Sequence, residues 1–168
     1  MNKLSLSGMN RSNISPFVKF LENKNLLTFD VLGDTEENFL NRLKIQKYVF
    51  LAKFYGLDLG YGHSMYKRGP YSPSLAVKYY ELAENPKVYE KEAKEPLPKS
   101  FDVVNFTNLV KSKDTDWLEI ATTLLEQESR FDNENELVKH VECIKCDYSL
   151  DYIKKVFKDL KSAKLVSS

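Results

Sequence analysis

EENFLNRLKIQKYVFLAKFY, residues 36–55, carries the strongest helix pattern in this chain of 168 residues. Asp34 or Thr35 can cap the helix, two glutamates follow at its positive N-terminal end, and Gly56 can end it. Apolar side chains mark two faces, one formed by Phe39, Leu43, Phe50 and Phe54 and the other by Ile45, Tyr48, Val49 and Ala52. A helix that is apolar most of the way round is usually buried on several sides. The pattern therefore predicts a central helix.

The segments that follow this helix predict a mainly α fold with one short extended element. Between residues 62 and 72, aromatic residues surround the Gly69-Pro70 pair, which continues neither a helix nor a strand ladder. We expect a short β-hairpin or an extended turn there. Ser72 can cap the next helix, which the apolar spacing carries to about residue 84.

The C-terminal part of the chain also has helical periodicity. From Trp117 onward, apolar residues recur at the spacing of one helix face. Two further helices are predicted over 133–145 and 149–163, joined by a tight polar turn. Two short helices with such a turn are typical of helix-turn-helix and winged-helix lobes.

The composition changes between residues 86 and 100, where Pro, Lys and Glu predominate without a clear period. Such a segment predicts a flexible connector between a helical lobe at 1–85 and a second helical lobe at 101–168. The alternative is that both lobes form one compact domain, which a chain of this length can also build.

The charges exclude a strong general attraction to polyanions. The 25 basic and 24 acidic side chains leave a formal charge of only +1, and four of the basic residues are Arg. This balance disfavours nucleic acid and anionic membranes as default partners. The chain has no apolar run that predicts a signal peptide or a membrane span, and its two cysteines are too few for a disulfide framework. We therefore expect a cytoplasmic protein.

His140, Cys143 and Cys146 have a spacing that zinc sites also use, because imidazole and thiolate are natural zinc ligands. A structural site needs four ligands, and the other histidine, His63, is far away in the sequence. The alternative is two reduced cysteines at the end of an amphipathic helix. A thioredoxin-type redox pair is not favoured, because no strand–helix pattern precedes the cysteines. We predict no metal and no cofactor.

A cationic pair beside the Gly-Pro turn is the best candidate for a binding surface. A helix N-terminus follows the turn, so the segment could receive an anion or a carboxylate of a partner. The alternative is a structural turn that packs Tyr71 against the central helix. The candidate partner-binding residues are Tyr66, Lys67, Arg68, Gly69, Pro70, Tyr71 and Ser72.

Four lysines on the last predicted helix form a second candidate surface. Lys154, Lys155, Lys158 and Lys161 lie mainly away from the apolar stripe of that helix and could contact phosphates. The favoured alternative is a solvated polar face, because the helix also carries aspartates and has no Arg, Asn or Gln to read bases. No recognised catalytic motif is present, so we predict that the protein is not an enzyme. A catalytic site that forms only in three dimensions stays open.

LKIQKYVFLAKF (43–54) followed by MYKRGPYSPSL (65–75) resembles the helix and Gly-Pro turn of the Panacea, or SocA-like antitoxin, domain and of the related YwgA-like proteins. Lys44 and Lys47 stand near the lysine of the family pattern, and Gly69-Pro70 near its Gly-Pro. The resemblance covers residues 36–84, and the later helices are similar to the YwgA-like proteins more than to Panacea. It implies a mostly helical fold and a role as an antitoxin or adaptor; YwgA-like proteins have no activity that could be carried over.

These patterns together predict a regulatory protein-interaction protein of the cytoplasm, antitoxin-like or adaptor-like, whose partner is another protein. The alternative is a DNA-binding transcriptional regulator that uses the helix pair at 133–163. No membrane partner is expected, and the oligomeric state stays open.

Overall fold

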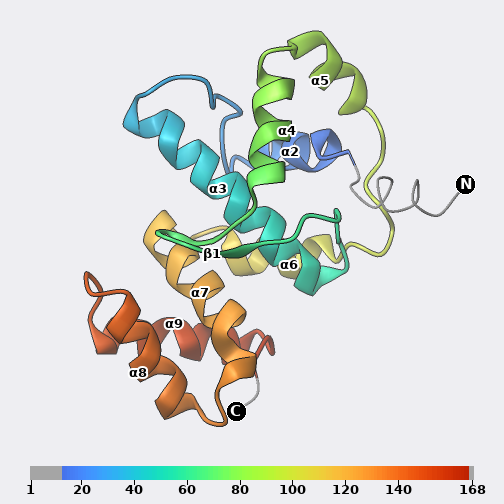
Figure 1. The fold of residues 1–168 in the computed structure, drawn as a ribbon. Helices are drawn as coiled ribbons and strands as arrows, with labels where there is room; N and C mark the ends of the chain where they lie inside the picture. Colours follow the sequence, from blue (N-terminus) through green and yellow to red (C-terminus); the bar gives the residue numbers. More distant parts are fainter. Residues whose placement is uncertain (1–12, 167–168) are drawn as a thin grey trace, which may run out of the picture. The chain divides into compact units, whose positions relative to one another are not determined.

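The computed structural model describes residues 13–166, and within them the fold is mainly α with one small antiparallel hairpin (Figure 1). This confirms the predicted fold class. The elements are, in chain order, α2 (Ser15–Asn23), α3 (Glu36–Ala52), the 3₁₀ turn η1 (Lys53–Tyr55), β1 (Ser64–Tyr66), β2 (Gly69–Tyr71), α4 (Pro73–Ala83), α5 (Pro86–Glu92), α6 (Val103–Val110), α7 (Thr115–Gln127), the 3₁₀ turn η2 (Glu128–Arg130), α8 (Glu134–Ile144) and α9 (Leu150–Ser162).

The chain forms two compact units, and their boundaries differ from the predicted lobes. Unit 1 contains residues up to 63 together with 72–111, and unit 2 contains 64–71 together with 112–168. The hairpin therefore belongs to unit 2 although its neighbours on both sides belong to unit 1. The first twelve residues of the predicted lobe 1–85 lie outside the described residues.

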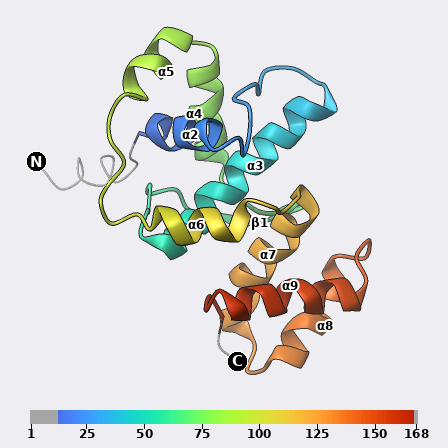
Figure 2. The same ribbon diagram turned by 180° about the vertical axis from the view of Figure 1, so that it is seen from behind.

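The predicted connector at 86–100 begins with a helix. Pro86 opens α5, where a missing N–H costs nothing, and Tyr89 of this helix is 4% exposed. The hydroxyl of Tyr89 donates to Glu22 at 2.9 Å, so α5 is held against α2 (Figure 2). Seven residues are too few to show a helical period, which is why composition alone indicated a linker.

Helix α3 is the predicted central helix of unit 1. Thr35 caps it through the backbone N–H of Asn38, and the Asn38 side chain completes the capping box. Most of its side chains from Leu43 to Ala52 are buried. Gly56 ends the helical segment with φ +86°, and the backbone of Ser100 lies so close that a side chain at this position would clash.

The core of unit 1 contains a cluster of aromatic rings. Phe17 and Phe20 of α2 contact Phe101 and Phe106 through ring pairs at centroid distances of 5.6 to 6.3 Å. Offset and edge-to-face pairs of this kind add to the stabilisation that burial of the rings already gives.

The start of α4 is fixed to α3 by a buried amide. The Gln46 side chain donates to the carbonyl of Ser72 at 2.9 Å and accepts from its backbone N–H at 2.8 Å. Ser72 in turn caps α4 through the N–H of Leu75. Both Gln46 and Ser72 are buried, at 1% and 0% exposure.

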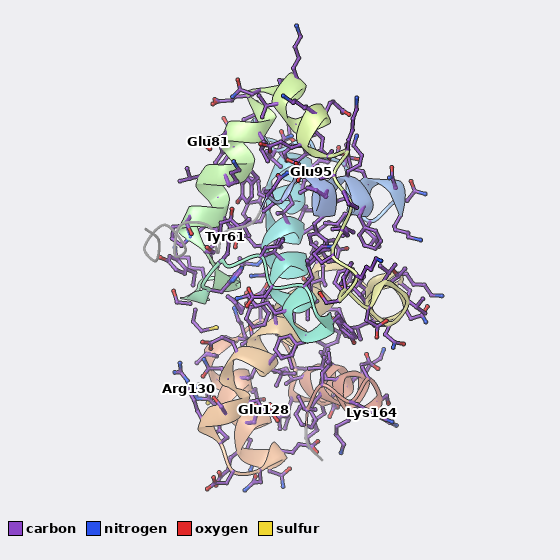
Figure 3. The ribbon with its side chains drawn as sticks, turned by 90° about the vertical axis from the view of Figure 1, so that its right-hand side faces the viewer. Tyr61, Glu81, Glu95, Glu128, Arg130 and Lys164 are labelled. Carbon is purple, nitrogen blue, oxygen red and sulfur yellow. The ribbon has the colours of Figure 1, made fainter. Side chains whose placement is uncertain are left out.

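Unit 2 is built around α7, which packs against both strands of the hairpin and against α8 and α9 (Figure 1). The apolar stripe of α9 faces inward, as the sequence predicted. In α8 the buried side chains are Leu137, Val138 and Val141, whereas Ile144, which the same spacing would place on this stripe, is exposed near the end of the helix. Just beyond the end of α9 lies Lys164, labelled in Figure 3. It takes a left-handed conformation with φ 63°, and the N–H of Leu165 then donates to the carbonyl of Leu160 at 3.0 Å. Over the described residues, no helix has the length and apolarity that a membrane span requires.

Candidate functional site

The hairpin of unit 2 presents two cations at its turn. Ser64 pairs with Tyr71, and Tyr66 pairs with Gly69, so Lys67 and Arg68 form the two-residue connection. Gly69 has φ +98°, a conformation that L side chains rarely adopt, which accounts for a glycine directly after the turn. The strand β2 packs on α7.

A buried carboxylate on α7 joins the turn to the end of α8. The side chain of Glu119 is 4% exposed; its Oε1 accepts from Arg68 Nε at 2.6 Å and its Oε2 accepts from Lys145 Nζ at 2.8 Å. Lys145 Nζ also donates to the backbone carbonyl of Lys67 at 2.8 Å. Three segments far apart in the sequence therefore meet at Glu119.

The charges in this cluster stabilise one another. Burial opposes ionisation of Glu119, but hydrogen bonds from Lys145 and Arg68 outweigh burial and hold the pKa of this carboxyl below its ordinary value. Burial alone would lower the pKa of Arg68, but the hydrogen bond to Glu119 raises it by more, so the pKa lies above its ordinary value. Glu119 and Arg68 are therefore both ionised at neutral pH.

Tyr148 adds a hydroxyl to the same cluster. Its O–H lies 2.9 Å from Asp116 Oδ1 and 3.2 Å from Glu119 Oε1. Burial and the hydrogen bond to Asp116 raise the pKa of Tyr148. The phenol is thus kept protonated as a donor between two carboxylates.

A hollow of about 560 Å³ opens beside this cluster, and all its lining residues belong to unit 2. The lining is rich in charge, with three basic and three acidic side chains. The residues are Lys67, Arg68, Asp116, Glu119, Ile144, Lys145, Cys146, Asp147 and Tyr148.

The predicted partner-binding segment divides into a buried and an exposed part. Gly69, Pro70 and Ser72 are buried, and Tyr71 is half-buried with its ring 5.0 Å from that of Tyr66. Tyr66 is 52% exposed and Lys67 is exposed. Arg68 is half-buried, and its Nε is bonded to Glu119. The part of the segment that a partner could reach is therefore 66–68.

The predicted nucleic-acid lysines lie on α9 as the pattern indicated. Lys154, Lys155 and Lys158 are exposed. Lys161 pairs with Glu134 at 3.3 Å, so α9 is tied to α8 through this lysine. Exposed acidic residues on and between the same helices dilute the positive charge, namely Glu136, Glu142, Asp147 and Asp151.

The weak metal candidates do not assemble. The His140 ring packs against Phe131 at a centroid distance of 4.8 Å, and Cys143 and Cys146 are free and exposed. Among the described residues, no three or more His, Cys, Asp or Glu side chains are grouped as metal ligands would be.

Sequence reasoning missed Asp116, Glu119, Lys145 and Tyr148 as members of a site. One signal was present for Glu119, which stands between Leu118 and Ile120 inside an apolar run. A carboxylate in such a run is buried only when it is paired. The sequence does not say which cation pairs with it, because Arg68 is 51 residues away.

A second group of ionisable side chains lies in unit 1. The imidazole of His63 packs on Phe50 at 5.5 Å, and Lys53 donates to the carbonyl of Tyr61 at 2.6 Å. Burial, together with the ammonium groups of Lys53 and Lys47, lowers the pKa of His63 to about 4. The folded protein therefore holds His63 neutral in mildly acidic solution.

This pKa makes the stability of the protein depend on His63 in acid. The unfolded chain binds the proton near pH 6.5 and the folded chain near pH 4, so the unfolded state binds more protons between these values. The free energy of unfolding should therefore fall as the pH falls from about 6.5 to about 4. Above about pH 6.5, His63 should have little effect on how stability depends on pH. Against His63→Gln, the wild-type protein should lose about 2 kcal/mol between neutral pH and about pH 4, a figure reduced for the partial exposure of the ring. Urea unfolding followed by circular dichroism at several pH values measures this difference, and parallel pH profiles of the two proteins would contradict it.

No protein-family model matches this chain, and neither a curated protein nor a solved structure shows significant similarity to it.

Proposed function

We propose that this protein is a regulatory protein-interaction protein of the cytoplasm and that it binds another protein through the turn and hollow of unit 2. The observation that carries the proposal is the position of exposed apolar side chains. Within the described part of unit 2, Tyr66 at 52% and Ile144 at 43% are the large apolar side chains that are exposed. Tyr66 adjoins Lys67, and Ile144 lines the same hollow as Lys67 and Arg68. We call Tyr66, Lys67, Arg68, Ile144 and Tyr148 the recognition surface.

The chemistry of the recognition surface fits a protein partner. Interfaces are enriched in Tyr and Arg and combine an apolar centre with a polar rim. The basic and acidic residues around the hollow balance one another, which suits a partner that carries both charges rather than a polyanion.

The recognition surface is also held in place before binding. Arg68 is bonded to the buried Glu119, and the carbonyl of Lys67 accepts from the buried Lys145. Ordering a flexible loop on binding costs free energy, and a turn that is already fixed avoids most of that cost. The resemblance of 36–84 to Panacea and YwgA-like proteins agrees with an antitoxin-like or adaptor-like role for such a surface.

An alternative function is DNA binding by α8 and α9. It is favoured by the exposed Lys154, Lys155 and Lys158 on one helix of a packed helix pair. The acidic residues on and between these helices oppose it. One experiment can separate the two functions.

The experiment captures partners from cells of the source organism with four purified proteins. They are the wild-type protein, Tyr66→Ser/Ile144→Ser, the matched control Val77→Ser/Val104→Ser on exposed sites of unit 1, and Lys154→Gln/Lys155→Gln/Lys158→Gln. We expect one partner protein to be retained by the wild type, the control and the lysine variant, and about tenfold less by the first variant, because central apolar contacts dominate interfaces.

Purified partner must then reproduce this order of affinities by calorimetry, with folding of each variant verified by circular dichroism. Equal binding by the wild type and Tyr66→Ser/Ile144→Ser would contradict the proposal. Retention that nuclease abolishes, that falls with salt and that the lysine variant loses would establish the DNA-binding alternative instead.

A further inference from the structure

We propose that Cys143 and Cys146 are a reversible dithiol modification site, which a low-molecular-weight disulfide such as oxidised glutathione converts to an intramolecular disulfide. We further infer that closing this bond pulls Lys145 away from Glu119 and loosens the hairpin turn. The regulatory meaning of the switch rests on the proposed function, whereas the bond and its structural effect do not.

The two thiols are close together and open to reagents. Cys143 lies in the last turn of α8, and Cys146 follows the end of that helix. Both are free and exposed, and the Sγ of Cys146 lies 3.5 Å from the backbone carbonyl oxygen of Cys143. A disulfide needs Cβ atoms about 3.5–4.5 Å apart and a dihedral angle near 90°. We infer that the bond forms by rotation of the two side chains together with a change of the backbone at Lys145, which stands between the two cysteines.

The surroundings favour thiol–disulfide exchange over the other roles of paired cysteines. Metal binding lacks a third ligand among the described residues. The neighbouring imidazole of His140 is packed on Phe131 rather than bonded to a thiol. The short segment between the cysteines gives the bond little entropic stabilisation, so a thiol pool can reduce it again.

The exchange balances without any group from the protein beyond the two cysteines. The thiolate of one cysteine, whose proton has passed to solvent, attacks the small disulfide, forms a mixed disulfide and releases one small thiolate. The thiolate of the second cysteine then attacks the protein sulfur of the mixed disulfide and releases the second small thiolate. The two protons from the cysteines end on the two released thiols, and the two electrons pass from the protein sulfurs to the small disulfide.

Lys145 couples this bond to the recognition surface. It stands between the two cysteines, its side chain is 6% exposed, and its Nζ lies 2.8 Å from Glu119 Oε2. The same Nζ donates to the carbonyl of Lys67 at 2.8 Å. Forming the disulfide draws Cys146 from the carbonyl of Cys143 and changes the backbone on both sides of Lys145. Hydrogen bonds weaken steeply with distance and angle, so the hold of Lys145 on the hairpin turn weakens.

The test treats the full chain with a graded ratio of oxidised to reduced glutathione and reads intact mass, cysteine alkylation and hydrogen exchange. We expect the wild-type chain to lose the mass of two hydrogens, to resist alkylation at both cysteines, and to show several-fold faster exchange in residues 64–71. Reduction should reverse all three changes. Cys143→Ser and Cys146→Ser should each take up one glutathione and leave the exchange of 64–71 unchanged.

Stable glutathione adducts on both cysteines of the wild type, or covalent dimers, would overturn the disulfide. A disulfide that leaves exchange in 64–71 unchanged would overturn the coupling through Lys145. None of these readouts uses a partner, so their failure is distinct from failure of the proposed function.

Discussion

Replacing Glu119 by Leu is expected to destabilise unit 2 by about 3–5 kcal/mol, because the substitution leaves Lys145 buried without its counter-ion. Lys145→Met should cost a similar amount, since among the described residues it leaves Glu119 with only the partly exposed Arg68 as an ionic partner. The double variant Glu119→Leu/Lys145→Met buries no charge at this position. We expect it to be more stable than the sum of the single effects by about 2–3 kcal/mol.

Trp117 offers the measurement, because it is the only tryptophan of the chain and lies on α7, two residues before Glu119. Its fluorescence during urea unfolding reports on unit 2. Lys158→Met, which removes an exposed ammonium group from α9, is the matched control and should change stability by less than about 0.5 kcal/mol. Additive single effects in the double variant would show that Glu119 and Lys145 do not stabilise each other.

The same variants should also change how the stability of unit 2 depends on pH. The pKa of Glu119 is below its ordinary value, so its contribution to stability is complete above about pH 5 and is lost as the pH falls through the folded-state pKa. Glu119→Leu should remove this acid-dependent part of the stability of unit 2.

The helices of this protein could be predicted because local signals agree with one another. Thr35 caps α3 and Gly56 follows η1 at the positions that the sequence indicated, and the apolar period fills the interval between them. Such signals act within a few residues, so no knowledge of the tertiary structure was needed. Where a helix is too short to show a period, as in α5, the same reasoning fails.

The candidate site could be predicted only in part, because its members come from segments far apart in the chain. The sequence predicted a turn at the Gly-Pro pair, but Gly69 and Pro70 lie in β2, paired with Tyr66 and Met65, and the turn is formed by the adjacent cations Lys67 and Arg68. The connection of this turn to Glu119 and Lys145 could not be predicted, since these residues lie 51 and 78 positions from the hairpin residues that they bond. An ion pair that closes only in the folded state leaves no periodic pattern in the sequence.

The bond between Arg68 and Glu119 changes how a role of Arg68 in partner binding should be tested. The sequence offered Arg68 as a contact for a partner, whereas the structure uses its Nε to neutralise a buried carboxylate. Loss of partner binding in an Arg68 variant would therefore mix recognition with stability. Tyr66 and Ile144 separate the two, because both side chains are exposed and neither is part of the ionic cluster.

Gln46→Leu is the second substitution with a large expected effect, and it acts in unit 1. The variant removes the acceptor of the Ser72 N–H and one donor to the Ser72 carbonyl, which keeps its bond from the N–H of Ala76. A buried donor left without a partner costs about 1–3 kcal/mol, so we expect a total loss of about 2–4 kcal/mol. The loss should appear as lower resistance to urea by circular dichroism.

The residues in which hydrogen exchange accelerates show why Gln46→Leu loses stability. If the amide of Gln46 fixes the start of α4, hydrogen exchange in residues 72–77 should accelerate in Gln46→Leu more than exchange in α6 of the same unit. Glu81→Leu places a leucine on the exposed side of α4 and should change neither stability nor exchange appreciably (Figure 3). A uniform acceleration across unit 1 would instead show that Gln46 supports the general packing of α3, and an unchanged protein would show that Ser72 does not depend on this amide. Faster exchange confined to 72–77 would mean that one side chain of the central helix sets where the chain re-enters unit 1 after the hairpin.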